Sequence, residues 1–134
     1  MKTILFILIT IISVLDAQNV PTYVPTNSLV GWWPFSGNAA DSSSYSNNGN
    51  PGFGVSLTSD RFSNSNKAYL FSGGGNISLI ALPTLNNQDF TITGWIRTNN
   101  TNVQKGIACW GQDSPWASTY FYITNTGYLK FDFA

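Results

Sequence analysis

The sequence contains no histidine and no glutamate, and these two absences exclude most catalytic chemistry. Without histidine, a Ser–His or Cys–His nucleophile pair cannot form, and a zinc site of histidine and cysteine lacks its ligands. Retaining glycoside hydrolysis needs two carboxylates about 5 Å apart, and no segment that could form a strand carries two aspartates within ten residues. We therefore expect no catalytic residues in this chain and no enzymatic activity of its own.

Cysteine and charge are also scarce. Cys109 is the single cysteine, so a disulfide within the chain is excluded. Its apolar neighbours Ala108 and Trp110 predict a buried thiol, and the alternative is pairing with a group outside this sequence. Six basic and six acidic residues are dispersed along the chain without clusters. This pattern predicts neither nucleic-acid binding nor a polybasic membrane patch. The polar surface must come from Asn, Ser and Thr, as is common in extracellular β proteins.

Long apolar runs are missing except at the N-terminus. Residues 4–15 are almost entirely apolar, which is too short for a transmembrane helix but typical of the core of a signal peptide. With small Ala17 at the expected cleavage site, we predict a signal peptide over 1–17, an extended lead-in over 18–28 and one secreted domain over 29–134. The alternative is an uncleaved N-terminal anchor. No membrane span is expected after cleavage.

Short alternating apolar segments, separated by Gly, Asn, Ser and Pro, are what the remaining sequence does contain. This spacing predicts an all-β fold without helices. The expected strands cover residues 29–35, 55–58, 68–71, 76–82, 90–98, 106–111, 120–124 and 128–133. Residues 90–98 show the clearest period-two alternation, which puts alternate side chains on opposite faces.

Glycines and large apolar side chains refine this expectation. Glycines 73–75 should adopt positive φ at a tight connection, and residues 125–127 should close a hairpin between the last two strands. The expected core residues are Phe35, Phe71, Phe90 and Ile92, together with most of Trp32, Trp33, Trp95 and Trp110. Asp132, in the last strand, is expected to be a surface residue.

Several motifs occur in an order that resembles a known family. They are LVGWWPFSGNAAD at 29–41, an Asn/Gly-rich loop at 42–49, DRF at 60–62, KAYLFSG at 67–73 and FTITGWI at 90–96. Together they resemble laminin-G-like domains of the concanavalin A-like lectin/glucanase superfamily, found in secreted bacterial surface proteins. The resemblance implies a jelly-roll sandwich of two antiparallel sheets on the cell surface or outside the cell. It also implies a domain several tens of residues longer, so that 29–134 would be incomplete.

The same resemblance implies a calcium site in the loop that begins at Asp41. The candidate ligands are Asp41, Asn47 and Asn48, since calcium prefers carboxylate and amide oxygens in loops. Ser72 and Asn76 stand where the family usually has aspartates, which would weaken the site. The alternative is that Asp41 folds the loop through an Asx turn.

Carbohydrate binding needs exposed aromatic rings beside hydrogen-bonding groups. Trp116, in a polar loop, and the nearby Tyr120 and Tyr122 are the candidates, with Trp116 alternatively covering the edge of the sandwich. We therefore expect a non-catalytic extracellular module that binds carbohydrate. A protein-contact or adhesion module and a structural spacer without a ligand are the alternatives, and the oligomeric state is left open.

Overall fold

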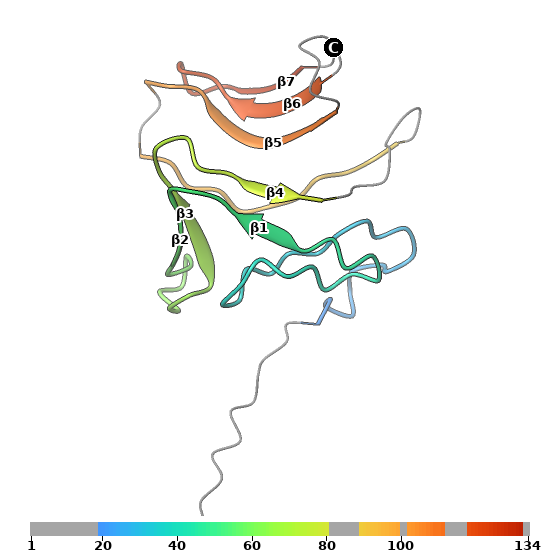
Figure 1. Cartoon of the computed structure of the whole chain (residues 1–134). Helices are drawn as coiled ribbons and strands as arrows, with labels where there is room; N and C mark the ends of the chain where they lie inside the picture. Colours follow the sequence, from blue (N-terminus) through green and yellow to red (C-terminus); the bar gives the residue numbers. More distant parts are fainter. Residues whose placement is uncertain (1–18, 81–88, 100–101, 112–117, 133–134) are drawn as a thin grey trace, which may run out of the picture. The chain divides into compact units, whose positions relative to one another are not determined.

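The computed structural model describes residues 19–80, 89–99, 102–111 and 118–132, and this part of the chain is all-β (Figure 1). The predicted signal peptide, residues 1–17, lies outside the described residues. The strands are β1 (Gly49–Pro51), β2 (Val55–Thr58), β3 (Ala68–Phe71), β4 (Ile77–Leu79), β5 (Lys105–Gly111), β6 (Ser118–Ile123) and β7 (Leu129–Asp132). All strand pairs are antiparallel. Nothing in the described part forms a helix of the length and hydrophobicity needed to cross a membrane. The jelly-roll arrangement stays a prediction.

The chain divides into two compact units, Met1–Gln88 and Asp89–Ala134. In the first unit, β1 pairs with β4 and β2 pairs with β3, giving two small sheets (Figure 1). Gly49 in β1 is required by close packing, because a Cβ there would lie 2.6 Å from Cγ2 of Ile77. Ala39, which is only 4% exposed, also packs against Gly49, and its carbonyl accepts a 2.7 Å hydrogen bond from the Gly49 amide.

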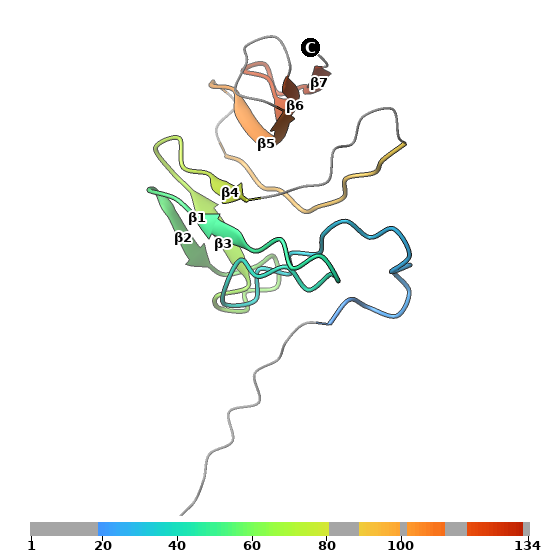
Figure 2. The ribbon, with the colours of Figure 1, turned by 45° about the vertical axis from the view of Figure 1, so that its right-hand side comes forward.

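The second unit contains a three-stranded sheet in the order β5-β6-β7, whose strands lie side by side in both views (Figures 1 and 2). A register shift between Gly106 and Ala108 marks a bulge in β5. The β6–β7 turn follows from Gly127, whose φ of 87° favours glycine, and from the amide of Tyr128, which donates to Oγ1 of Thr124 at 3.0 Å.

One face of this sheet is covered by an aromatic cluster of Phe90, Trp110, Phe121 and Phe131. The ring centroids of Phe90 and Trp110 lie 5.1 Å apart in an edge-to-face arrangement. Phe131 contacts the other three rings at 5.8 to 6.0 Å. Such pairs stabilise beyond the area they bury, and this cluster is the main apolar packing described in the second unit.

Several predicted elements are confirmed. Residues 55–58 and 68–71 are β2 and β3, residues 106–111 lie within β5, and the last two strands form the predicted hairpin. Gly73 and Gly74 have positive φ, as expected, whereas Gly75 does not. The strands that they connect, however, pair in different sheets.

Two predicted strands are wrong. Residues 29–35 form an irregular segment flanked by left-handed residues, Ser28 at φ 65° and Phe35 at φ 55°. Residues 90–98 have no assigned strand, because no segment among the described residues supplies a pairing partner. Alternation in a sequence sets which side chains share a face, and a ladder also requires a neighbouring strand.

The expected core is correspondingly smaller. Phe35 and Phe90 are half-buried, and each has an edge-to-face partner: Phe35 packs on Tyr69 at 5.2 Å and Phe90 on Trp110 at 5.1 Å. The core prediction is wrong for Phe71, Ile92 and Trp95, because their side chains are 50%, 41% and 84% exposed. Phe71 ends a strand of a two-stranded sheet, and the other two lie in the segment that pairs with no described strand.

Cys109 is exposed, which corrects the predicted buried thiol. In β5 its neighbour Trp110 points to the aromatic cluster. Successive side chains of a strand alternate between faces. Cys109 therefore lies on the opposite face of the sheet, directly across from Tyr120.

Candidate functional site

The loop around Asp41 brings together the three residues predicted as calcium ligands. Asp41 is buried, at 8% exposed, and both of its carboxylate oxygens accept hydrogen bonds. Oδ1 accepts from the amides of Trp32 and Ser43, both at 2.8 Å. Oδ2 accepts from the Ser43 hydroxyl at 2.7 Å and from the Asn47 amide at 2.9 Å. The side-chain oxygen of Asn48 accepts from the Asp41 amide at 3.0 Å.

These contacts are those of a carboxylate that organises a loop. The bond from the Ser43 amide, two residues on, forms the Asx turn of the alternative interpretation. Burial raises the pKa of Asp41, but the hydrogen bonds from Trp32, Ser43 and Asn47 outweigh it and hold that pKa below its ordinary value. The carboxylate is therefore charged at neutral pH and held by four donors.

The donor set around Asp41 does not favour a cation. A carboxylate can accept about four hydrogen bonds. The Asp41 carboxylate already accepts four, three from N–H groups and one from an O–H group. Two further buried atoms near this loop, Nε1 of Trp32 and Nδ2 of Asn47, are donors as well, and neither has a hydrogen-bond partner among the described residues. Calcium binding stays a prediction, and it requires some of these donors to turn away.

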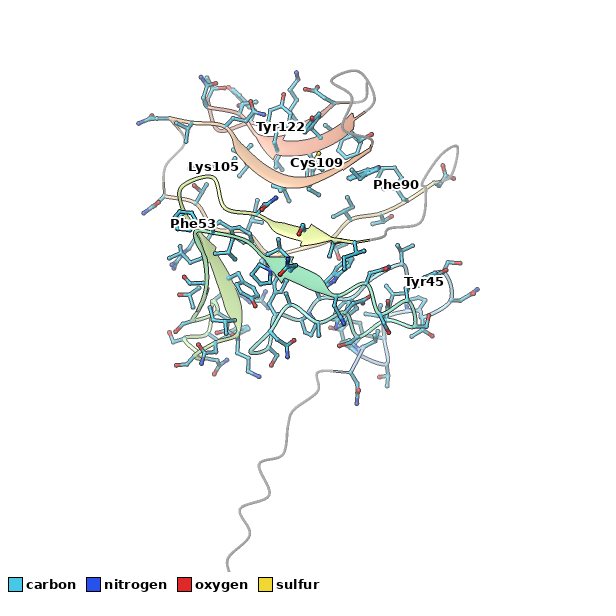
Figure 3. All side chains as sticks on the ribbon, in the orientation of Figure 1. Tyr45, Phe53, Phe90, Lys105, Cys109 and Tyr122 are labelled. Carbon is cyan, nitrogen blue, oxygen red and sulfur yellow. The ribbon has the colours of Figure 1, made fainter. Side chains whose placement is uncertain are left out.

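A second arrangement lies on the face of the β5-β6-β7 sheet opposite to the aromatic cluster. We call it the tyrosine face and define it by Tyr120, Tyr122, Lys130 and Asp132. Tyr120 pairs directly with Asp132, and Tyr122 pairs with Lys130. Figure 3 labels Tyr122 on this sheet. Alternate residues of paired strands share a face, so the hairpin register alone brings these four side chains together.

A hydrogen-bond network connects three of the four residues. The Tyr122 hydroxyl donates to Oδ2 of Asp132 at 2.7 Å. Nζ of Lys130 lies 3.1 Å from Oδ2 and 3.0 Å from Oδ1 of the same carboxylate. The Lys130 ammonium also lies 5.9 Å from the centre of the Tyr122 ring. The network is anchored at one end by a buried ring, because Tyr122 is 8% exposed.

The charges of this network are fixed at neutral pH. The hydrogen bond from Tyr122, followed by that from Lys130, lowers the pKa of Asp132. The hydrogen bond to Asp132, followed by the contact with Tyr122, raises the pKa of Lys130. Both charged side chains are accessible, with Lys130 54% and Asp132 41% exposed. The face therefore presents an accessible ion pair beside the ring of Tyr120, which is 43% exposed.

The structure brings two of the three predicted carbohydrate contacts, Tyr120 and Tyr122, onto one face. Trp116 lies outside the described residues. Sequence reasoning missed Lys130 and placed Asp132 only as a surface residue. The signal was present, since Lys130 and Asp132 alternate in the strand that the predicted hairpin folds back onto the two tyrosines. A register counted from the turn at 125–127 would have paired them.

Comparison with known proteins gives no relative: no family model matches the chain, and no curated protein or solved structure matches it at a significant level. The laminin-G-like assignment therefore rests on the sequence motifs and stays a prediction.

Proposed function

We propose that this chain is a non-catalytic carbohydrate-binding module, with the tyrosine face as its binding surface. The observation that carries the proposal is the pairing of Tyr120 with Asp132, which sets a partly exposed aromatic ring beside an accessible ion pair. An aromatic ring offers an apolar surface to the C–H groups of a sugar. Charged groups at its side form strong, directional hydrogen bonds with sugar hydroxyls.

The charge state of the face supports binding in preference to catalysis. A general acid needs a pKa near the working pH, whereas hydrogen bonds from Tyr122 and Lys130 lower the pKa of Asp132. Glycoside hydrolysis also uses a pair of carboxylates. Among the four residues of the tyrosine face, Asp132 is the single carboxylate. These features suit a residue that stays charged and orients a ligand.

The test is binding of the full chain to an immobilised oligosaccharide panel, followed by titration of the best ligand. We expect Tyr120→Ala to weaken binding about tenfold, which corresponds to about 1.4 kcal/mol. Tyr23→Ala is the matched control, because Tyr23 is 82% exposed but belongs to the first unit. Binding that is equally strong in both variants would exclude the tyrosine face as the site.

A protein-contact module is the second candidate, and one observation favours it. Within residues 89–99, Ile92, Trp95 and Ile96 are 41%, 84% and 54% exposed. Exposed apolar groups of this kind occur at protein–protein interaction sites. If the oligosaccharide panel detects no binding, this second candidate replaces the first.

We also propose that the module acts outside the cell, on the basis of the signal peptide pattern at 1–17. The test is mass spectrometry of the chain secreted by an expressing cell. An N-terminus near Gln18 is expected. A chain that stays inside the cell with Met1 intact would contradict the extracellular location.

A further inference from the structure

The contacts on the tyrosine face indicate which class of sugar it would bind. This inference rests on the proposed function. The relevant features are the remaining hydrogen-bonding capacity of the network, its net charge and the position of Tyr120. All three follow from the register and contacts of β6 and β7.

Asp132 and Lys130 each keep unused hydrogen-bonding capacity. On Asp132, Oδ2 accepts from both Tyr122 and Lys130, whereas Oδ1 contacts the Lys130 ammonium alone within the part of the chain that the structure describes. An ammonium carries three N–H donors, and a carboxylate oxygen can accept about two bonds. Oδ1 of Asp132 can therefore accept one further hydrogen bond, and the adjacent Nζ of Lys130 can donate another.

Two adjacent hydroxyl groups of a sugar match this arrangement. One hydroxyl can donate to Oδ1 of Asp132 while the oxygen of the next accepts from Nζ of Lys130. Directly paired residues in an antiparallel ladder have Cβ atoms about 5 Å apart. Tyr120 therefore stands close enough to Asp132 for its ring to contact the same sugar unit.

The ion pair also argues against charged sugars. Lys130 and Asp132 neutralise each other at 3.0 Å, so the face carries no net charge from these two residues. A sugar carboxylate or sulfate would meet the Asp132 carboxylate, and an amino sugar would compete with Lys130 for it. Separating the pair to admit either ligand would remove the hydrogen bond that Asp132 accepts from Lys130.

From this geometry we infer that the tyrosine face binds an uncharged sugar through two adjacent hydroxyls, held between Asp132 and Lys130 with its ring against Tyr120. The ion pair acts as one polar unit in the free and the bound protein. Affinity should then be nearly independent of ionic strength, because screening acts on the interaction between net charges.

The experiment is a titration of the full chain with three oligosaccharide series of matched length: neutral, uronic-acid-containing and amino-sugar-containing. We expect neutral sugars to bind at least about tenfold more tightly than either charged series, which is about 1.4 kcal/mol. Between 50 and 500 mM salt, Kd of the neutral ligand should change by less than about twofold. Tighter binding of a charged series would overturn the inference while leaving carbohydrate binding intact.

Two variants locate the ligand on the pair. Lys130→Gln and Asp132→Asn should each weaken neutral-sugar binding about tenfold. Lys105→Gln is the matched control, because Lys105 pairs with Ile123 and so lies on the opposite face of the same sheet. Binding unaffected by Lys130→Gln and Asp132→Asn would overturn the inference. If no series binds at all, it is the proposed function itself that fails.

Discussion

Each of the two units contains a carboxylate held by hydrogen bonds, and the two are held differently. Asp41 in the first unit is 8% exposed and accepts four bonds, three of them from backbone amides. Asp132 in the second unit is 41% exposed and bonds to two side chains, Tyr122 and Lys130. The first network is closed to other partners, and the second is open at its solvent side.

This difference is the basis for proposing a structural role for Asp41 and a binding role for the tyrosine face. A buried charge that is fully hydrogen-bonded stabilises the fold around it, and it is costly to remove. An exposed ion pair contributes little to stability but can exchange water for a ligand. The sequence resemblance draws attention to the Asp41 loop, whereas the contacts favour the tyrosine face as the place where a ligand binds.

Replacing Asp41 should have the largest effect on stability. Asp41→Ala leaves the amides of Trp32, Ser43 and Asn47 without their acceptor. We expect the free energy of unfolding of the first unit to fall by about 3 kcal/mol. Urea denaturation followed by tryptophan fluorescence measures the change.

Asp60→Ala provides the control for this prediction. Asp60 also folds a turn, by accepting from the amides of Phe62 and Asn64, but that turn is exposed. Its removal should shift the urea midpoint much less than Asp41→Ala does. Equal shifts would show that the closed network gives no special stability. If Asp41→Ala does not fold, Asp41→Asn, which keeps one acceptor oxygen, should show an intermediate loss.

Removing one ring of the aromatic cluster should have the next largest effect, confined to the second unit. Phe131 contacts Phe90, Trp110 and Phe121, so Phe131→Ala should destabilise this unit by about 2 kcal/mol. Hydrogen exchange should accelerate in β5 to β7 and stay unchanged in β1 to β4. Tyr128→Ala, at a side chain 72% exposed, is the control. Acceleration in β1 to β4 as well would contradict an effect limited to the packing around Phe131.

Acid should weaken the first unit through Asp41. Its pKa in the folded protein lies below the ordinary value of about 3.9. Its contribution to stability is therefore complete above that value and is lost as the pH falls through the folded pKa. The urea midpoint should drop as the pH falls below about 3.9, by less in Asp41→Asn than in the unmodified chain. An identical drop in both would assign the acid sensitivity to other groups.

Calcium should have the smallest effect. Because N–H and O–H donors surround the Asp41 carboxylate, we expect the thermal midpoint to differ by less than about 1 °C between calcium and a chelator. A rise of several degrees with calcium would contradict this expectation. It would assign Asp41, Asn47 and Asn48 as ligands, as the family resemblance implies.

The sequence predicts local structure better than it predicts which segments pair with or contact one another. Residues 55–58 and 68–71 are predicted as strands because short, largely apolar segments lie between turn signals, and both are strands. Residues 90–98 have the same signal, but alternation does not show which segment will pair with them. In the Asp41 loop, the contact with Ser43 follows from a two-residue spacing, whereas the bond from the Trp32 amide depends on how two segments meet.

The sequence predicts only some of the residues of the tyrosine face. The sequence indicates Tyr120 and Tyr122 as aromatic residues near a polar loop. Their partners Lys130 and Asp132 depend on the hairpin register, which the turn at 124–128 fixes through its hydrogen bonds. Cys109 was misplaced because apolar neighbours do not determine which face of a strand a residue occupies.

The most direct test of the binding role is an NMR titration of the uniformly ¹⁵N-labelled full chain with a neutral oligosaccharide selected from the panel. We predict amide shift changes concentrated at Tyr120, Tyr122, Lys130 and Asp132, with the amides of Trp32, Ser43 and Asn47 unchanged. Changes concentrated in the Asp41 loop, with the tyrosine face unaffected, would contradict the division between a closed structural network and an open binding network.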